Sequence, residues 1–143
     1  MEKVRLIYGF LSFLFLIAGI CVYLFFRDLS GILFFAKMPI SEFALNEIIQ
    51  LTPSLFSNVL KYNLAGMFWL VSGILFFRFI WLYRAKEQKV YIGCFIGLAA
   101  VLEISQLSGK VPGTFDPADL LFMGIGAFGE GLIYNIFVRR RIA

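Results

Sequence analysis

Four acid or amide side chains surround a short polar break in an otherwise apolar sequence. Such a group could gather a hard cation through oxygen ligands, hold a polar headgroup by hydrogen bonds, or act as a paired acid and base. The spacing of the residues does not choose among these three kinds of chemistry. The four candidates are Glu103, Gln106, Asp116 and Asp119.

Glu103 and Gln106 lie near the end of an apolar stretch, three positions apart, so a helix would place both on one face. A charged residue at the centre of a membrane span costs about 3 kcal/mol on insertion scales, and less near an end. We therefore expect Glu103 to face other helices, either neutral or bonded to a partner. The candidate partners are Gln106, Asp119, Lys110 and Lys61.

Asp116 and Asp119 open the last apolar stretch with the pattern of a helix start. Asp116 would be the N-cap, Pro117 the first helical residue, and Asp119 an acid in the first turn. Capping and attraction to the positive helix end could explain both aspartates at about 0.5 to 2 kcal/mol each. A capping role and a binding role therefore both stay open for Asp116.

Glu130 is a second candidate, because it lies well inside the last apolar stretch with glycines on both sides. A carboxylate at this depth is typical of proton-coupled transporters. It could instead bond to Tyr134 or Asn135 on its own helix, or to Arg78 on another. We favour this structural role over transport.

The composition is that of an integral membrane protein. Of the 143 residues, 61% are hydrophobic and only 15% are charged, and the mean hydropathy is +0.88, which is outside the range of soluble domains. The chain has no histidine, which excludes imidazole acid–base chemistry and zinc sites that need imidazole. We expect neither a metal nor a cofactor. The net charge is +4, but the basic residues flank apolar stretches, where they would contact anionic lipid headgroups rather than nucleic acid.

Four stretches approach the length of about 20 apolar residues that crosses a bilayer. Because a spanning segment must satisfy its own backbone hydrogen bonds, we expect helices, and hence a single all-α transmembrane domain over residues 1–143. Small residues such as Gly93 and Gly97, a GxxxG pair, mark expected helix contacts. The predicted spans cover residues 6–26, 60–83, 90–107 and 118–138.

Lysine and arginine flank these spans mainly on one side of the membrane. The positive-inside rule then predicts that both termini are cytoplasmic and that the polar break is outside. The outer segment, residues 27–60, is too apolar for a disordered linker, so it would be an interfacial helix or a packed lid. The basic residues on the cytoplasmic side are Lys3, Arg5, Arg84, Lys86, Lys89, Arg139, Arg140 and Arg141.

The region around the polar break resembles the VanZ-like family of small bacterial membrane proteins. That family has Glu-x-x-Gln at the end of one span, a short loop, and Asp-x-x-Asp at the start of the next span with glycines behind. Many members also have an arginine just before the aspartates, where this chain has Gly113-Thr114. If that arginine serves an anionic headgroup, Lys110 must replace it or the activity differs. The matching residues are Leu102-Glu103-Ile104-Ser105-Gln106, Gly113-Thr114-Phe115-Asp116-Pro117-Ala118-Asp119, Gly126 and Gly129.

The resemblance implies that Glu103, Gln106, Asp116 and Asp119 form the family's characteristic site. It also implies a cell-envelope role in the bacterial plasma membrane, since the family's namesake is associated with resistance to the glycopeptide teicoplanin. Our leading hypothesis is an outward-facing polar pocket that binds an envelope lipid or a cell-wall precursor. The alternatives are an enzyme acting on a lipid-linked substrate and a small oligomeric proton-coupled transporter using Glu130. Whether the chain forms a homo-oligomer stays open.

Overall fold

The structure is a computed structural model, and it describes residues 2–26, 63–109 and 115–139. The expected outer segment between the first two spans and the candidate Lys110 both lie outside the described residues. All the secondary structure in the described ranges is helical. The elements are α1 (Glu2–Phe26), α4 (Leu64–Trp81), α5 (Ala85–Ser105), the 3-10 turn η2 (Gln106–Ser108), α6 (Pro117–Ile133) and the π-helical η3 (Tyr134–Arg139).

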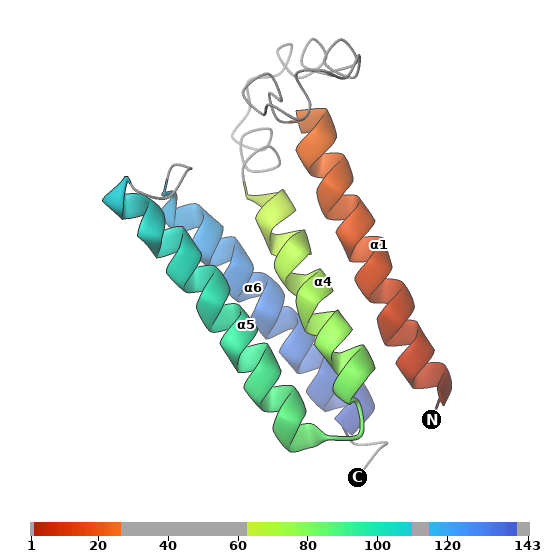
Figure 1. Cartoon of the computed structure of the whole chain (residues 1–143). Helices are drawn as coiled ribbons and strands as arrows, with labels where there is room; N and C mark the ends of the chain where they lie inside the picture. The colour runs from red at the N-terminus through yellow and green to blue at the C-terminus, as the bar shows by residue number, and fades with distance from the viewer. Residues whose placement is uncertain (1, 27–62, 110–114, 140–143) are drawn as a thin grey trace.

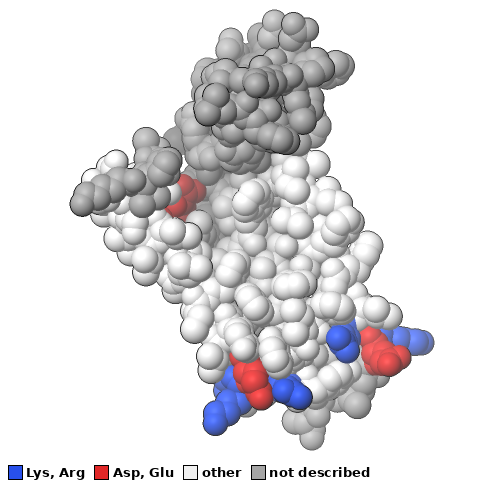
Figure 2. All heavy atoms as spheres, viewed as in Figure 1, with Lys and Arg blue, Asp and Glu red and all other residues white. Residues whose placement is uncertain are grey.

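The four long helices stand side by side and alternate in direction along the chain (Figure 1). The start of α1 and the end of η3 lie at the same end of this bundle, together with the short turn between α4 and α5. The end of α5 and the start of α6 meet at the opposite end. On the face shown in Figure 2, the basic side chains gather at the end with the termini, with acidic side chains beside them. A wide band without charged side chains separates this end from acidic side chains at the other end.

Three helices in the described part of the chain are long and apolar enough to cross a membrane. They cover Glu2–Val22, Leu64–Trp81 and Ala85–Ser108. The expected all-α membrane fold is confirmed to this extent, and a fourth crossing by α6 stays a prediction. The α-helical part of α6 has 17 residues and continues into η3.

Helix boundaries differ from the predicted spans where polar residues are helical. The span that we expected to begin at residue 90 is helical from Ala85, and its first turns carry Lys86 and Lys89. Hydropathy marks the apolar part of a helix, whereas the backbone hydrogen bonds continue into the polar residues that flank it.

Close packing holds α1 against α4. The Ser12 hydroxyl donates to the Ser72 carbonyl oxygen at 2.9 Å, and the Ser72 hydroxyl donates to the Ser12 carbonyl oxygen at 2.8 Å. Beside this pair, Tyr8 packs with Val71 and Leu75 in the buried core. Each serine hydroxyl is thereby satisfied without water, as a membrane interior requires.

The helix α4 is the centre of the bundle, and α5 is its most exposed member. In α4, 39% of the membrane-length window is buried, against 6% in α5. On the other side of α4, Gly126 allows α6 to approach closely, because a Cβ there would lie 2.8 Å from Met67 Cγ and 2.9 Å from Val71 Cγ2. The bundle is therefore built around α4, and α5 contacts the other helices with only a small part of its surface.

Candidate functional site

The polar site begins with Glu103, which lies near the end of α5 and is only 7% exposed. Gln106 Nε2 donates to Glu103 Oε2 at 3.2 Å, as the three-residue spacing predicts. The backbone N–H of Asp116 points at Glu103 Oε1 from across the α5–α6 connection, at 3.5 Å. The expectation that Glu103 faces the other helices and finds partners agrees with this geometry.

The carboxylate of Asp116 serves as the N-cap of α6. Its Oδ1 accepts from the Ala118 N–H at 2.9 Å, its backbone is extended, and Pro117 follows as the first helical residue. This arrangement satisfies one of the N–H groups that a helix start leaves unpaired. Asp116 thus contributes its backbone N–H to Glu103 while its side chain holds the helix start in place.

Asp119 connects the start of α6 to the start of α4. The side chain of Asn63, immediately before α4, donates from Nδ2 to Asp119 Oδ1 at 3.1 Å, and Asn63 is buried. Our sequence reasoning missed Asn63. The signal was available, because Asn63 is a polar residue near the outer end of the predicted span 60–83, where a buried side chain needs a hydrogen-bond partner.

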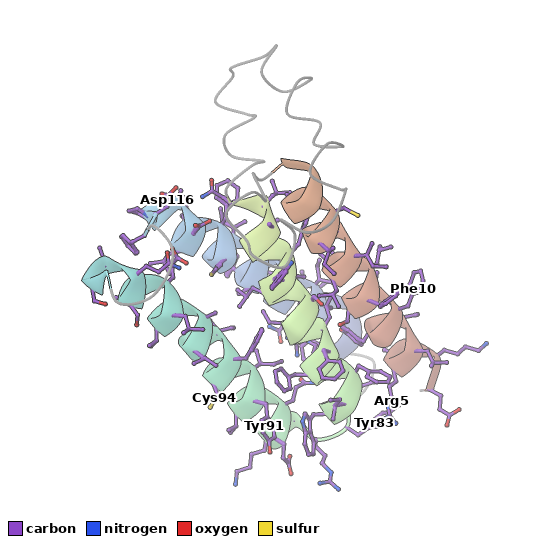
Figure 3. All side chains as sticks on the ribbon, turned by 45° about the horizontal axis from the view of Figure 1, so that its top comes forward. Arg5, Phe10, Tyr83, Tyr91, Cys94 and Asp116 are labelled. Atoms are coloured by element: carbon purple, nitrogen blue, oxygen red, sulfur yellow. The ribbon has the colours of Figure 1, made fainter. Side chains whose placement is uncertain are left out.

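The polar site is defined here as Glu103, Gln106, Asp116, Asp119 and Asn63. It lies at the opposite end of the bundle from the labelled Arg5 and Tyr83 (Figure 3). Within the described residues, no group of three histidine, cysteine, aspartate or glutamate side chains is arranged to hold a metal ion. The site offers carboxylate and amide oxygens that accept hydrogen bonds, which suits a ligand that donates them.

A cavity of about 470 Å³ reaches the polar site from the side of the bundle. Its walls come from α1, α4, α5 and α6, and most of them are apolar or aromatic. Among the described residues that line it, Glu103 alone is acidic. The buried Glu103 carboxylate therefore belongs to the polar site and also lines the mostly apolar cavity.

Glu130 lies in a second polar cluster, nearer the end of the bundle with the termini. Arg78 Nε and Nη2 donate to the two oxygens of Glu130 at 2.5 and 2.8 Å, and both side chains are buried. Arg78 Nη1 also donates to Gln88 Oε1 at 2.8 Å, and its guanidinium lies 3.5 Å from the centroid of the Tyr134 ring. The structure thus joins Glu130 to Arg78, one of the partners the sequence suggested, and adds Gln88, which the sequence reasoning had not singled out.

The two clusters differ in what they can do. In the Arg78–Glu130 cluster, the guanidinium binds the carboxylate, the Gln88 amide and the Tyr134 ring, so these groups satisfy one another. The polar site consists mainly of acceptors beside a cavity, so its arrangement is the one suited to a ligand. Compared with protein-family models, curated proteins and solved structures, the chain matches none.

Proposed function

We propose that the chain is a bacterial cell-envelope protein of the VanZ-like type, which crosses the plasma membrane four times with both termini in the cytoplasm. Its polar site faces outward and binds the headgroup of an envelope lipid or of a lipid-linked cell-wall precursor. This binding changes the susceptibility of the cell to glycopeptides such as teicoplanin.

The observation that carries the proposal is the burial of Glu103 where the polar site meets the apolar cavity. A buried carboxylate is costly in a membrane unless its neighbours compensate, and here an amide and a backbone N–H do so. A polar acceptor beside an apolar cavity matches the two parts of an amphiphile, a donor headgroup and a hydrocarbon chain.

The orientation is supported by the distribution of charge. Lys3, Arg5, Lys86 and Lys89 are exposed and belong to helix ends at the terminal end of the bundle. Positive residues favour the cytoplasmic side, so the polar site would face the outside, where cell-wall precursors are used.

The test compares Glu103→Gln and Asp119→Asn with the wild type in cells that express equal amounts of protein. The readouts are glycopeptide susceptibility and retention of envelope lipids by the purified protein. Glu87→Gln is the matched control, since it makes the same change on α5 at the other end of the bundle. We expect both site variants to lose lipid retention and to shift susceptibility while the control does neither. Wild-type behaviour of both site variants would mean that the polar site is only structural.

A further inference from the structure

The cavity beside Glu103 is built from side chains that recur at helical spacing on facing helices. On α5 these are Phe95, Ala99, Leu102 and Glu103, which follow one stripe of the helix at intervals of four, three and one residues. The stripe on α4 runs over eleven residues, and two glycines in it leave room for the neighbouring side chains. The α4 residues in the lining are Gly66, Trp69, Leu70, Ser72, Gly73 and Phe76.

The dimensions of the cavity match a hydrocarbon chain. The ten steps from Gly66 to Phe76 correspond to about 15 Å of helix. A cavity of about 470 Å³ with this length averages about 30 Å² in cross-section. A narrow, elongated space of this kind is wide enough for a hydrocarbon chain.

The cavity also opens on the outer surface of helices that are apolar enough to cross a membrane. Trp69 and Leu102, which line it on α4 and α5, are 50% and 52% exposed, on helices that are apolar enough to cross a membrane. A chain can therefore enter sideways from the lipid without passing through water. The volume lies within the range of about 300–1,000 Å³ that is usual for ligand sites.

The end of the cavity carries one acidic side chain, and two more lie in the adjoining polar site. Glu103 lines it, and Asp116 and Asp119 belong to the same polar site. A carboxylate has about four acceptor positions, so Glu103 can accept from a ligand in addition to its protein donors. Among lipid headgroups, a primary amine combines positive charge with three donors, which complements this acidic end in a medium of low dielectric constant.

We propose that the cavity holds one acyl chain of a phospholipid that carries a primary amine in its headgroup, with the amine at the Glu103 carboxylate. This inference rests on the proposed function and names its ligand: a lipid that already resides in the membrane. The lipid enters between α4 and α5, and its second chain stays in the bilayer.

The chain-binding part is tested with phosphatidylethanolamine that carries a diazirine in the middle of one acyl chain. The full-length protein is reconstituted with this lipid, irradiated, and mapped by mass spectrometry. Ala99→Phe fills the cavity, and Ala99→Leu is a milder filling variant in case the larger ring disturbs folding. Cys94→Phe is the control, because Cys94 is exposed on the same helix and is not in the cavity lining (Figure 3).

We expect the wild type and Cys94→Phe to crosslink at the α4 and α5 stripes more than at the outer face of α5. Both Ala99 variants should lose this preference and keep their helical content. Equal crosslinking over all faces of α5 in the wild type, or an unchanged preference in both Ala99 variants, would overturn the proposal.

The headgroup part is tested with phosphatidylglycerol that carries the same photoreactive chain. We expect stronger cavity crosslinking with the amine lipid, and Glu103→Gln should remove that difference. Equal or stronger crosslinking by phosphatidylglycerol would refute the amine. If the Ala99 variants abolish cavity crosslinking while Glu103→Gln and Asp119→Asn leave susceptibility unchanged, the chain site stands and the proposed function fails. If instead Glu103→Gln and Asp119→Asn shift susceptibility while both Ala99 variants keep the cavity crosslinking, the proposed function stands and the acyl-chain site is overturned.

Discussion

Replacement of Glu130 by leucine should destabilise the bundle more than any surface substitution. Glu130 receives two hydrogen bonds from Arg78, at 2.5 and 2.8 Å, and the side chains of this pair are only 7% and 9% exposed. Without the carboxylate, the guanidinium keeps its bond to Gln88 and its contact with the Tyr134 ring. Its charge, however, would be buried without a counterion.

The size of the effect follows from these contacts. A hydrogen bond to a charged group contributes about 1.5–3 kcal/mol, so the two bonds give about 3–6 kcal/mol. Breaking a buried ion pair typically costs about 3–5 kcal/mol. Polar groups in membrane proteins also find partners in the unfolded state, which lowers the net value. We therefore expect Glu130→Leu to reduce the free energy of unfolding by about 3 kcal/mol.

The assay is a double-mutant cycle with Glu130→Leu, Arg78→Met and the two combined. Reversible unfolding in mixed micelles, followed by circular dichroism, gives each free energy. The combined variant has no buried charge, so its loss should fall short of the sum of the single losses by about 2 kcal/mol. Lys89→Met, at an exposed position, is the control and should stay within about 0.5 kcal/mol of the wild type. Additive losses, or a loss in Glu130→Leu no larger than that of the control, would refute this account of the pair.

Three further predictions use the same unfolding measurement. Asp116→Ala should reduce stability by about 1 kcal/mol because it removes the N-cap of α6, whereas Asp116→Asn keeps the cap and should change little; equal losses would exclude capping as the cause. Ser12→Ala and Ser72→Ala should each reduce stability by about 0.6 kcal/mol, since each removes one hydrogen bond between α1 and α4; no loss in either would show that the bonds contribute nothing. Gly126→Val should reduce stability by about 1–3 kcal/mol through overpacking against α4, whereas Gly129→Val, where a Cβ meets nothing within 4 Å, should change little; the idea fails if both glycines respond alike.

Much of the helical architecture could be predicted from long apolar stretches, because a membrane leaves few alternatives for a backbone that must bond to itself. The start of α6 was also predictable, since Asp116 and Pro117 form a strong local capping pattern. The pairing of Glu103 with Gln106 followed from helical spacing alone. These features depend on residues close together in the sequence.

Contacts between distant helices were harder to predict. Arg78 was one of several partners that the sequence allowed for Glu130, and Gln88 was not considered. The choice depends on how α4 and α6 are rotated against each other, which hydropathy does not encode. The GxxxG pair at Gly93 and Gly97 was expected to mark a helix contact, yet a Cβ at either position would meet nothing within 4 Å among the described residues. Small residues permit close approach but do not say which helix will approach.

The Arg78–Glu130 pair also fixes the depth at which α6 stands beside α4. Sliding α6 by one residue would move it about 1.5 Å along its axis and turn it by about 100°, so the carboxylate would leave the guanidinium. Asp119 lies eleven residues before Glu130 on the same helix, about 16 Å away along the axis. The ion pair therefore fixes the position of α6 along its axis relative to α4. This position places Asp119, at the far end of α6, within hydrogen-bond distance of Asn63.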